Sequence, residues 1–307
     1  ANQWWDPIAE FWGYHGYWAR DFKSVDEHYG KLEDYQRLAK SLHAKNMYLI
    51  QDIVVNHTGN FFYYDGDYDE QNVKQNFKLN TDSIPTVSAS QFPFTQNDVN
   101  QVADQQANIF NWTPAIEDIT VYKQETTYQT SDLDDMNTKN PVVRNALKDS
   151  FGYWIKEAGV DAFRIDTAKY VEKEFYEDFL HGEDGIVTTA KSTGRNDFFT
   201  FEQNKAIIDA SNVISKKHKI PIYHETHRGR FSYNLLDTNN YLEQISELKL
   251  TLDISHWMVV HESLLQNQDV ALEEVIDKSK HIHARVGYAE GPQVNDPEAP
   301  EWTRAVN

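Results

Sequence analysis

The strongest chemical signal in the sequence is a group of charged residues at the end of an apolar segment. Residues 159–170 are predicted to contain a short buried strand, and Arg164, Asp166 and Lys169 lie within it or directly after it. A parallel strand that is covered on both faces is normally almost entirely apolar, and unpaired charges there are costly. In a β/α barrel, the carboxyl ends of the strands carry the active site. The pattern therefore indicates either a catalytic carboxylate or a structural Arg–Asp pair that caps the strand.

Other predicted strands end in polar residues in the same way, and predicted helices separate them. The strands are 47–55, 159–166, 198–202, 219–227, 248–256 and 281–286, and the helices are 31–45, 141–158, 173–180, 203–217, 238–246 and 266–277. This alternation predicts an α/β fold, a (β/α) barrel of the TIM type. A closed barrel of this type needs eight strands, so we expect an incomplete barrel. Residues 60–140 are predicted to be a long inserted subdomain after the first of these strands.

Net charge, aromatic content and the absence of cysteine limit the kinds of molecule that this protein is expected to bind. The formal net charge of −19 argues against a nucleic-acid partner, which needs clustered Lys and Arg. The 8 Trp, 17 Tyr and 16 Phe suit a sugar that stacks on rings, and the acidic residues suit a bound cation. Cysteine is absent, which excludes disulfides and Cys-ligated zinc and fits a cytosolic or a periplasmic protein equally. No apolar run approaches the roughly 18 residues of a membrane span, so no membrane partner is expected.

The first two thirds of the chain, residues 1–200, resemble the α-amylase family of glycoside hydrolases. Four segments carry the resemblance in family order, and they are the aromatic run at 14–18, then 52–57, 135–137 and 159–169. The resemblance implies retaining hydrolysis of α-glucosidic bonds in a sugar or oligosaccharide, with Asp166 as the nucleophile and Arg164 as its ion-pair partner. Such an enzyme needs one carboxylate as nucleophile and a second as acid/base.

The same resemblance implies further roles by position. His57 would hydrogen-bond the sugar in the cleavage subsite, Tyr17 would stack on it with Trp18 beside it, and Lys169 would contact the sugar on the leaving side. A calcium site would lie between the barrel and the insertion. It would be formed by Asn56 and Asp135. Tyr170 departs from the family, which often has His after this Lys.

The acid/base is harder to assign. The family pattern at the next strand is Phe-Gly-Glu, whereas here Glu202 follows Phe201 directly. Removing one residue from a strand turns the following side chain to the opposite face. Glu202 is the candidate general acid, and the family's later Asn-His-Asp motif, which supplies a third carboxylate, has no counterpart in this chain.

Residues 197–307 resemble instead the xylose-isomerase-like sugar phosphate isomerase/epimerase family. The segments that carry this second resemblance are 224–230, 253–257 and 281–288. It implies that successive strand ends supply Glu225, Asp253 and His283, with His256 nearby, to one divalent metal. A mixed oxygen and nitrogen site of this kind suits Mn, Mg or Zn. The reaction would be proton abstraction next to a carbonyl held on the metal.

Two resemblances in one chain are most simply explained by a hybrid that joins two barrel portions, 1–200 and 201–307, near residues 194–202. Three functions stay open on this interpretation. They are the retaining α-glucoside hydrolase, the divalent-metal-dependent isomerase or epimerase, and a catalytically silent hybrid barrel. An incomplete barrel also exposes strand edges, which favours self-association, so a homo-oligomer is expected.

Overall fold

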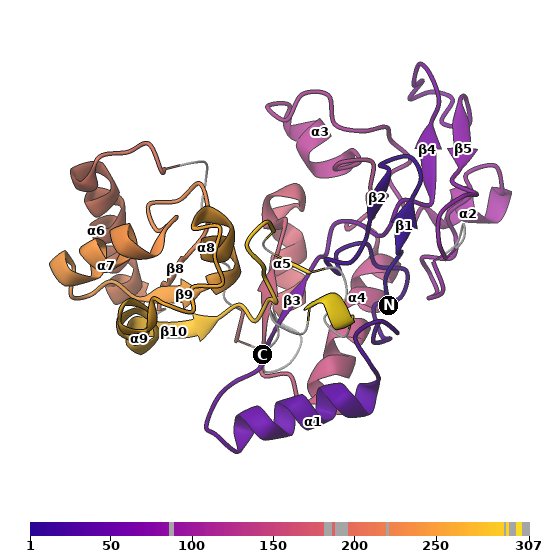
Figure 1. The fold of residues 1–307 in the computed structure, drawn as a ribbon. Coiled ribbons are helices and arrows are strands. Elements are labelled where there is room, and N and C mark those ends of the chain that lie inside the picture. Colours follow the sequence, from indigo (N-terminus) through magenta and orange to yellow (C-terminus); the bar gives the residue numbers. More distant parts are fainter. Residues whose placement is uncertain are drawn as a thin grey trace. The chain divides into compact units, whose positions relative to one another are not determined.

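The computed structural model describes residues 1–85, 89–180, 186–187, 196–218, 221–291, 293–294 and 299–302. The chain divides into two compact units, Ala1–Thr189 and Ala190–Asn307, and each is described by itself. Figure 1 shows the ribbon, with the first unit in indigo to magenta and the second in orange to yellow. Among the described helices, none has the length and apolar character that crossing a membrane requires.

A three-stranded parallel sheet lies at the centre of the first unit. Its strands are β3 (Ile50–Ile53), β6 (Ala162–Ile165) and β7 (Ile186–Val187), in the order β3-β6-β7. β3 and β6 pair so that Asp52 is opposite Arg164. Because the strands are parallel, their carboxyl ends meet at one edge of the sheet, which brings the charged ends of β3 and β6 together.

The helix before β6 has clear start and stop signals, and these determine where β6 begins. α4 (Pro141–Tyr153) begins at Asn140, whose side chain accepts a hydrogen bond from the backbone N–H of Val142, and has proline in its first turn. The helix widens into a π-helical turn, η1 (Trp154–Ala158), and ends at Gly159. Gly159 has a φ of 78°, a left-handed conformation that glycine adopts without steric cost. The chain then reverses directly into β6.

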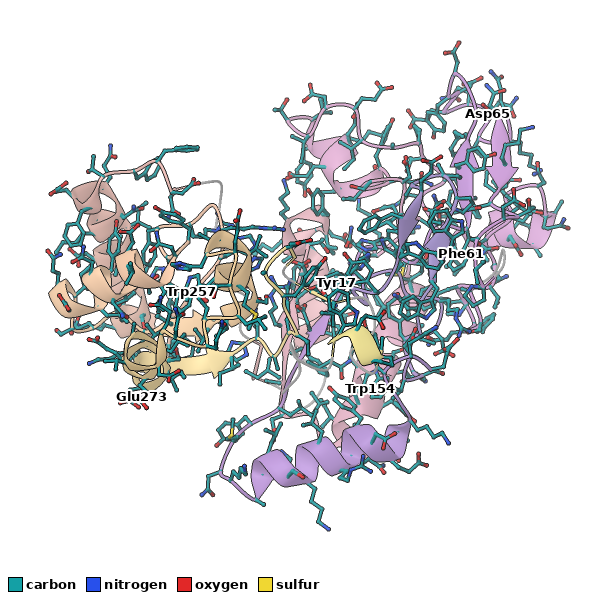
Figure 2. All side chains as sticks on the ribbon, viewed as in Figure 1. Tyr17, Phe61, Asp65, Trp154, Trp257 and Glu273 are labelled. Atoms are coloured by element: carbon teal, nitrogen blue, oxygen red, sulfur yellow. The ribbon has the colours of Figure 1, made fainter. Side chains whose placement is uncertain are left out.

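Shorter elements complete the first unit. They are β1 (Trp5–Asp6), β2 (Phe11–Trp12), α1 (Leu32–His43), β4 (Phe62–Tyr64), β5 (Phe77–Leu79), α2 (Val102–Ala107), α3 (Tyr122–Thr127), η2 (Ala168–Tyr170) and α5 (Lys173–Leu180). β4 and β5 form an antiparallel hairpin in the insertion. Phe61, labelled in Figure 2, is fully buried there. The insertion is tied to the end of β3 by a β-bridge between His57 and Asp135.

The second unit has its own parallel sheet and its own core. β8 (His224–Glu225), β9 (Leu250–Leu252) and β10 (Ser279–Ile282) are arranged in the order β10-β9-β8. Helices accompany these strands, namely α6 (Phe201–His218), α7 (Leu235–Gln244), α8 (Ile254–Val260) and α9 (Asp269–Lys278), with a short η3 (Pro300–Trp302). Trp257 is fully buried in this core (Figure 2). The described residues form open sheets and not a closed barrel.

The predicted strand at 198–202 is wrong, because this segment starts helix α6. The reason is a capping box at its beginning. The hydroxyl of Thr200 accepts from the backbone N–H of Gln203 at 3.3 Å, and the Gln203 side chain accepts from the backbone N–H of Thr200 at 2.9 Å. Glu202 therefore lies in the first turn of a helix, where its negative charge interacts favourably with the positive end of the helix dipole.

Two further predictions need correction. The strand predicted at 248–256 ends at Leu252, and His256 lies on helix α8 because the side chain of Asp253 caps that helix by accepting from Ser255 N–H. The segment 182–196, for which the sequence predicted neither a strand nor a helix, contains the short strand β7. The rest of that segment lies outside the described residues except for residue 196.

Candidate functional site

Arg164 joins two carboxylates at the strand ends of the first unit. Its Nη1 atom lies 2.8 Å from Oδ2 and 3.0 Å from Oδ1 of Asp52, on the neighbouring strand. The same atom lies 3.3 Å from Oδ1 of Asp166. Asp166 directly follows β6, and its backbone N–H donates to the carbonyl of Ile53 at 2.8 Å. Parallel pairing of β3 and β6 therefore places both carboxylates on one guanidinium.

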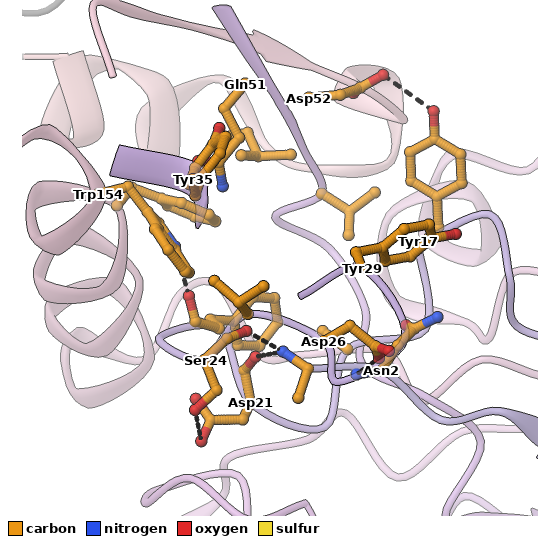
Figure 3. A pocket seen from close by; sticks show the side chains of 18 of the residues that line it. Asn2, Tyr17, Asp21, Ser24, Asp26, Tyr29, Tyr35, Gln51, Asp52 and Trp154 are labelled. Atoms are coloured by element: carbon orange, nitrogen blue, oxygen red, sulfur yellow. Dashed lines mark hydrogen bonds between the residues drawn. The ribbon is translucent and has the colours of Figure 1, made fainter. Parts of the chain in front are cut away.

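Tyr17 supplies a second donor to this group. Its hydroxyl donates to Oδ2 of Asp52 at 2.9 Å, as the dashed line in Figure 3 shows. Desolvation raises the pKa of Asp52, and Arg164 counteracts this only in part. Burial also opposes the charge of Arg164, but the carboxylates of Asp52 and Asp166 outweigh it and raise the guanidinium pKa. The arrangement holds Arg164 charged between two acids.

A cavity of about 430 Å³ lies beside Asp52 and Tyr17. Figure 3 shows Tyr35, Gln51 and Trp154 among the residues around it. The Tyr35 hydroxyl donates to the side chain of Gln51 at 3.1 Å, and Trp154 donates its indole N–H to the carbonyl of Phe22 at 2.7 Å. Tyr35 and Trp154, which line this cavity, thus donate their polar hydrogens to other protein groups.

His57 is buried and held on both sides of its ring. Nδ1 lies 2.9 Å from Oδ1 of Asn56, and Nε2 lies 3.2 Å from the carbonyl oxygen of Tyr17. Burial lowers its pKa to about 4, so the ring is neutral at pH 7. A sugar hydroxyl can bond this ring only if it displaces one of these contacts.

Trp18 and Lys169, both expected to contact sugar, make protein contacts. Trp18 is buried, and its ring packs edge-on against His15 at a centroid distance of 4.8 Å. Lys169 forms an ion pair at 3.0 Å with Glu125 of helix α3. Glu202, the expected acid/base, is exposed on α6 in the second unit.

The two residues expected to bind calcium lie next to each other. The carbonyl of Asn56 accepts from Met136 N–H at 2.8 Å, directly after Asp135. Asp135 is fully enclosed and accepts from the Asn111 amide at 2.6 Å, and burial raises its pKa well above the ordinary range. The amide oxygen of Asn56 already accepts from the Thr167 hydroxyl at 2.5 Å.

A second cluster occupies the strand ends of the second unit. Glu225 ends β8, Asp253 follows β9 and His283 follows β10, so three adjacent parallel strands each deliver one side chain. One ligand atom from each residue lies within 4.8 Å of the other two. His283 Nδ1 is 2.8 Å from Oε1 of Glu225 and 3.9 Å from Oδ2 of Asp253. These three residues are the ones that the sequence predicted to share a metal.

The remaining polar groups of this cluster surround Asp253. His256 Nε2 lies 3.8 Å from its Oδ2 atom, and Arg285 Nε lies 3.2 Å from the same oxygen. His256 is buried, and neither ring nitrogen has a hydrogen-bond partner among the described residues. Its ring packs against His227 at a centroid distance of 3.9 Å. Burial is the main cause that lowers the pKa of His256, to about 3, and the charges of His227 and Arg285 lower it further.

Comparison with known proteins identifies the family. The family model described as "Alpha amylase, catalytic domain" matches residues 2–281. The chain belongs to the alpha-amylase family. This membership supports the resemblance found in residues 1–200. The alpha-amylase match also spans Glu225 and Asp253, and the comparisons give no support to an isomerase-like segment or to a hybrid chain.

Individual relatives agree with the alpha-amylase assignment. The chain is 31% identical to an alpha-amylase of Streptomyces lividans over 62% of this chain and 22% of that protein. It is 32% identical to a cyclomaltodextrin glucanotransferase of Klebsiella oxytoca over 62% of this chain and 26% of that protein. The chain thus spans about a quarter of the length of these relatives.

A solved alpha-amylase shares the fold. The structure from Geobacillus thermoleovorans, complexed with acarbose, aligns with a TM-score of 0.53 and 18% identity, over 99% of this chain and 65% of that chain. The family match and this structural neighbour imply a (β/α) TIM barrel as the underlying fold. The described residues of this chain include two open parallel sheets and no closed barrel.

Two residues of the clusters were given no role from the sequence. Asp52 lies within one of the alpha-amylase-like segments, but only the pairing register of β3 and β6 shows that it faces Arg164. Arg285 lies two residues after His283, and its contact with Asp253 crosses from one strand end to the next. The one indication in the sequence was that Asp52 is a charged residue within an otherwise largely apolar predicted strand.

Proposed function

We propose that this alpha-amylase-family chain hydrolyses α-glucosidic bonds with retention of configuration, at a site centred on Asp166. The observation that carries the proposal is the guanidinium of Arg164 between Asp52 and Asp166, at the carboxyl ends of two paired parallel strands. Active sites of β/α barrels are built at this end of the strands. The names of the relatives, alpha-amylase and cyclomaltodextrin glucanotransferase, support α-glucan chemistry.

The chemistry assigns each group a task. The Asp166 carboxylate attacks the anomeric carbon while the bond to the leaving oxygen breaks and that oxygen takes a proton from an acid. Water then attacks the glycosyl–Asp166 ester, gives its proton to the same acid/base, and frees the sugar and the carboxylate. Arg164 orients Asp166 through their ion pair, and Asp52, which accepts a hydrogen bond from Tyr17, holds Arg164 in place.

Glu202 is the proposed acid/base, as the sequence suggested. A retaining hydrolase needs a second carboxyl group as acid/base, and Glu202 is the carboxyl group that the resemblance offers for this role. Glu202→Gln should slow hydrolysis of substrates with poor leaving groups most. Added azide should restore turnover of an activated aryl glycoside and produce a glycosyl azide, because azide needs no general base.

We also propose calcium between β3 and the insertion. Asp135 offers a buried carboxylate whose charge a cation would stabilise, and Asn56 lies beside it. Calcium takes about six to eight oxygen ligands, so backbone carbonyls and water would supply the rest. If this proposal holds, calcium should raise the thermal stability of the wild-type protein and not that of Asp135→Asn.

A second candidate function rests on Glu225, Asp253 and His283. Their ligand atoms lie close to the spacing that one shared metal requires, and Oδ2 of Asp253 is buried without a hydrogen bond among the described residues. This donor set fits a divalent ion such as Mn, Mg or Zn. We propose that these residues hold such an ion, which would polarise a sugar carbonyl in an isomerase or epimerase reaction.

A pair of matched variants tests the hydrolase. Asp166→Asn should reduce release of nitrophenol from 4-nitrophenyl α-glucosides by at least about a thousandfold, as expected when a nucleophile is removed. Asp161→Asn is the control, because Asp161 lies at the other end of the same strand and binds His43 and the backbone of Leu49. Equal activity of both variants would exclude Asp166 as the nucleophile.

Open strand edges support a further proposal on assembly. β3 lies at one end of its sheet order and β8 lies at one end of the other. Unpaired edges favour association between chains, so we propose a homo-oligomer. A monomeric mass by light scattering would contradict it.

A further inference from the structure

The two oxygens of Asp253 have different surroundings. Oδ1 accepts hydrogen bonds from the backbone N–H of Ser255 at 3.1 Å and from the Ser255 hydroxyl. Oδ2 is buried and accepts no hydrogen bond of normal geometry among the described residues. Because Ser255 takes up Oδ1, a metal held by Asp253 would bind to Oδ2.

Arg285 approaches this same oxygen. Its Nε atom lies 3.2 Å from Oδ2, whereas the histidine nitrogens of His283 and His256 lie 3.9 Å and 3.8 Å away. The Asp253 side chain has no exposed surface, while that of Arg285 is 28% exposed. A guanidinium is permanently charged in proteins. Arg285 is therefore the fixed positive charge closest to Oδ2 in the described cluster, and it has a path to solvent.

The two neighbouring carboxylates, Glu225 and Asp253, require a cation between them because their negative charges repel each other. The carboxylates of Glu225 and Asp253 lie within 4.8 Å of each other, one partly and one fully buried. Two like charges at this distance repel strongly in a poorly solvated site. Either a guanidinium or a divalent ion can neutralise them. Both cations on one carboxylate oxygen would repel each other.

We propose that Arg285 is a built-in competitor for the metal at Asp253, and that a divalent ion binds only as the guanidinium leaves Oδ2. This inference rests on the metal site proposed above. It makes the affinity of the site for metal a property of Arg285 as well as of the three ligands. The alternative is that Arg285 is a positioning residue, which keeps Asp253 ionised and ready for the metal. The two roles predict opposite effects when Arg285 is removed.

The experiment is calorimetric titration of the full chain with MnCl₂, after removal of bound metal. Arg285→Gln should bind Mn²⁺ about tenfold more tightly than the wild type, the scale of one charge-assisted contact. Arg285→Lys keeps the charge and should stay close to the wild type. Arg228→Gln is the matched control, since Arg228 also acts electrostatically on His256 but is exposed and has no ion pair with Asp253 in the structure. Its effect should be below about twofold, because water and salt screen an exposed charge.

Asp253→Asn tests whether the ion binds at Asp253, because this variant should abolish the heat of Mn²⁺ binding. Thermal unfolding gives an independent readout. Without metal, Arg285→Gln should unfold at a lower temperature than the wild type, because Asp253 has lost its counter-charge. With saturating Mn²⁺, the variant should gain more stability than the wild type, because it binds the ion more tightly.

The outcomes separate the two proposals. If neither the wild type nor Arg285→Gln binds Mn²⁺, the metal site itself is wrong and this inference falls with it. If both bind equally, or if Arg285→Gln binds more weakly, the metal site stands and the competitor role of Arg285 is overturned. Tighter binding by Arg285→Gln but not by Arg228→Gln supports the inference.

Discussion

The two strand-end clusters use an arginine in different ways. In the first unit, Arg164 lies between Asp52 and Asp166 and contacts both. In the second unit, Arg285 forms an ion pair with Asp253, and Glu225 pairs with His283 instead. In the first arrangement one guanidinium pairs with two carboxylates, and Asp166, the proposed nucleophile, lies beside a fixed cation. The second leaves a buried carboxylate oxygen of Asp253 without a hydrogen bond in the described part of the chain, as the proposed metal site requires.

The histidines follow the same contrast. Both ring nitrogens of His57 contact protein oxygens. Neither ring nitrogen of His256 has a hydrogen-bond partner among the described residues. Parallel strands thus bring polar residues together in both units, but the residues at the strand ends differ. They form an ion-pair network around Arg164 in the first unit. In the second unit they leave Oδ2 of Asp253 and the ring of His256 without a hydrogen bond among the described residues. Four predictions follow this contrast from the largest effect to the smallest.

His57 should make the stability of the first unit depend on pH in the acid range. Its pKa is about 4 in the folded protein and 6.5 in the unfolded chain. The unfolded state therefore binds the proton first, and stability is lost as pH falls from about 6.5 towards 4, by about 3 kcal/mol in total. Urea unfolding at pH 7 and pH 4.5 measures this loss.

His57→Gln should remove that part of the pH dependence, although it lowers stability at pH 7. His43→Gln, on helix α1, provides the control because His43 is half exposed and pairs with Asp161. An unchanged pH profile in His57→Gln would show that the ring is not buried in its neutral form.

Metal should stabilise the second cluster. A ligand at about one hundred times its dissociation constant adds about 2.7 kcal/mol to the stability of the state that binds it. Mn²⁺ or Zn²⁺ should therefore raise the unfolding temperature of the wild type, and Glu225→Gln and His283→Gln should abolish the shift. Asp52→Asn, in the first cluster, should leave the shift intact. A shift that survives in Glu225→Gln would place the ion elsewhere.

Arg164→Gln should cost stability that no metal restores. It leaves Asp52 and Asp166 without their common counter-charge, and because all three side chains are partly exposed we expect a loss of about 2 kcal/mol rather than the larger value of a fully buried pair. Chemical unfolding with and without Mn²⁺ measures it. Arg20→Gln is the control, since Arg20 pairs with the exposed Glu27. Rescue of Arg164→Gln by Mn²⁺ would contradict the contrast between the clusters.

Tyr17→Phe should have the smallest effect. It removes one hydrogen bond to Asp52, worth about 1 kcal/mol, while the ring remains stacked near His15. Turnover of an aryl α-glucoside should fall only severalfold, because Arg164 still contacts Asp52. Tyr14→Phe, in the same aromatic segment, is the control. A loss as large as that of Asp166→Asn would mean that Tyr17 takes part in the chemistry itself.

The sequence located both clusters because strand ends concentrate polar residues where an apolar pattern stops. Asp166 and Arg164 interrupt such a pattern, and the structure brings them together with Asp52. Glu225, Asp253 and His283 end three predicted strands, and the structure gathers their donor atoms. What each residue does at these positions stays a prediction.

Other features were missed because a competing local signal was overlooked, or because they depend on contacts between strands. The apolar run at 198–201 looked like a strand, but Thr200 and Gln203 at a spacing of three form a capping box that starts a helix. The roles of Asp52 and Arg285 depend on contacts between strands, which pattern within one strand does not encode. Trp18 was expected beside the sugar because of the family resemblance of residues 14–18, and the structure shows that its side chain is buried.

The most direct test of the account is covalent trapping of the nucleophile. The full chain is incubated with a 5-fluoro-α-glucosyl fluoride, whose fluoride leaves readily and whose ring fluorine slows hydrolysis of the glycosyl–enzyme ester. Peptide mass spectrometry should then show one added fluoroglucosyl group on Asp166, and none in Asp166→Asn. A label on another carboxylate, or hydrolysis of the reagent without any labelled peptide, would contradict the claim that Asp166 is the nucleophile of a retaining hydrolase.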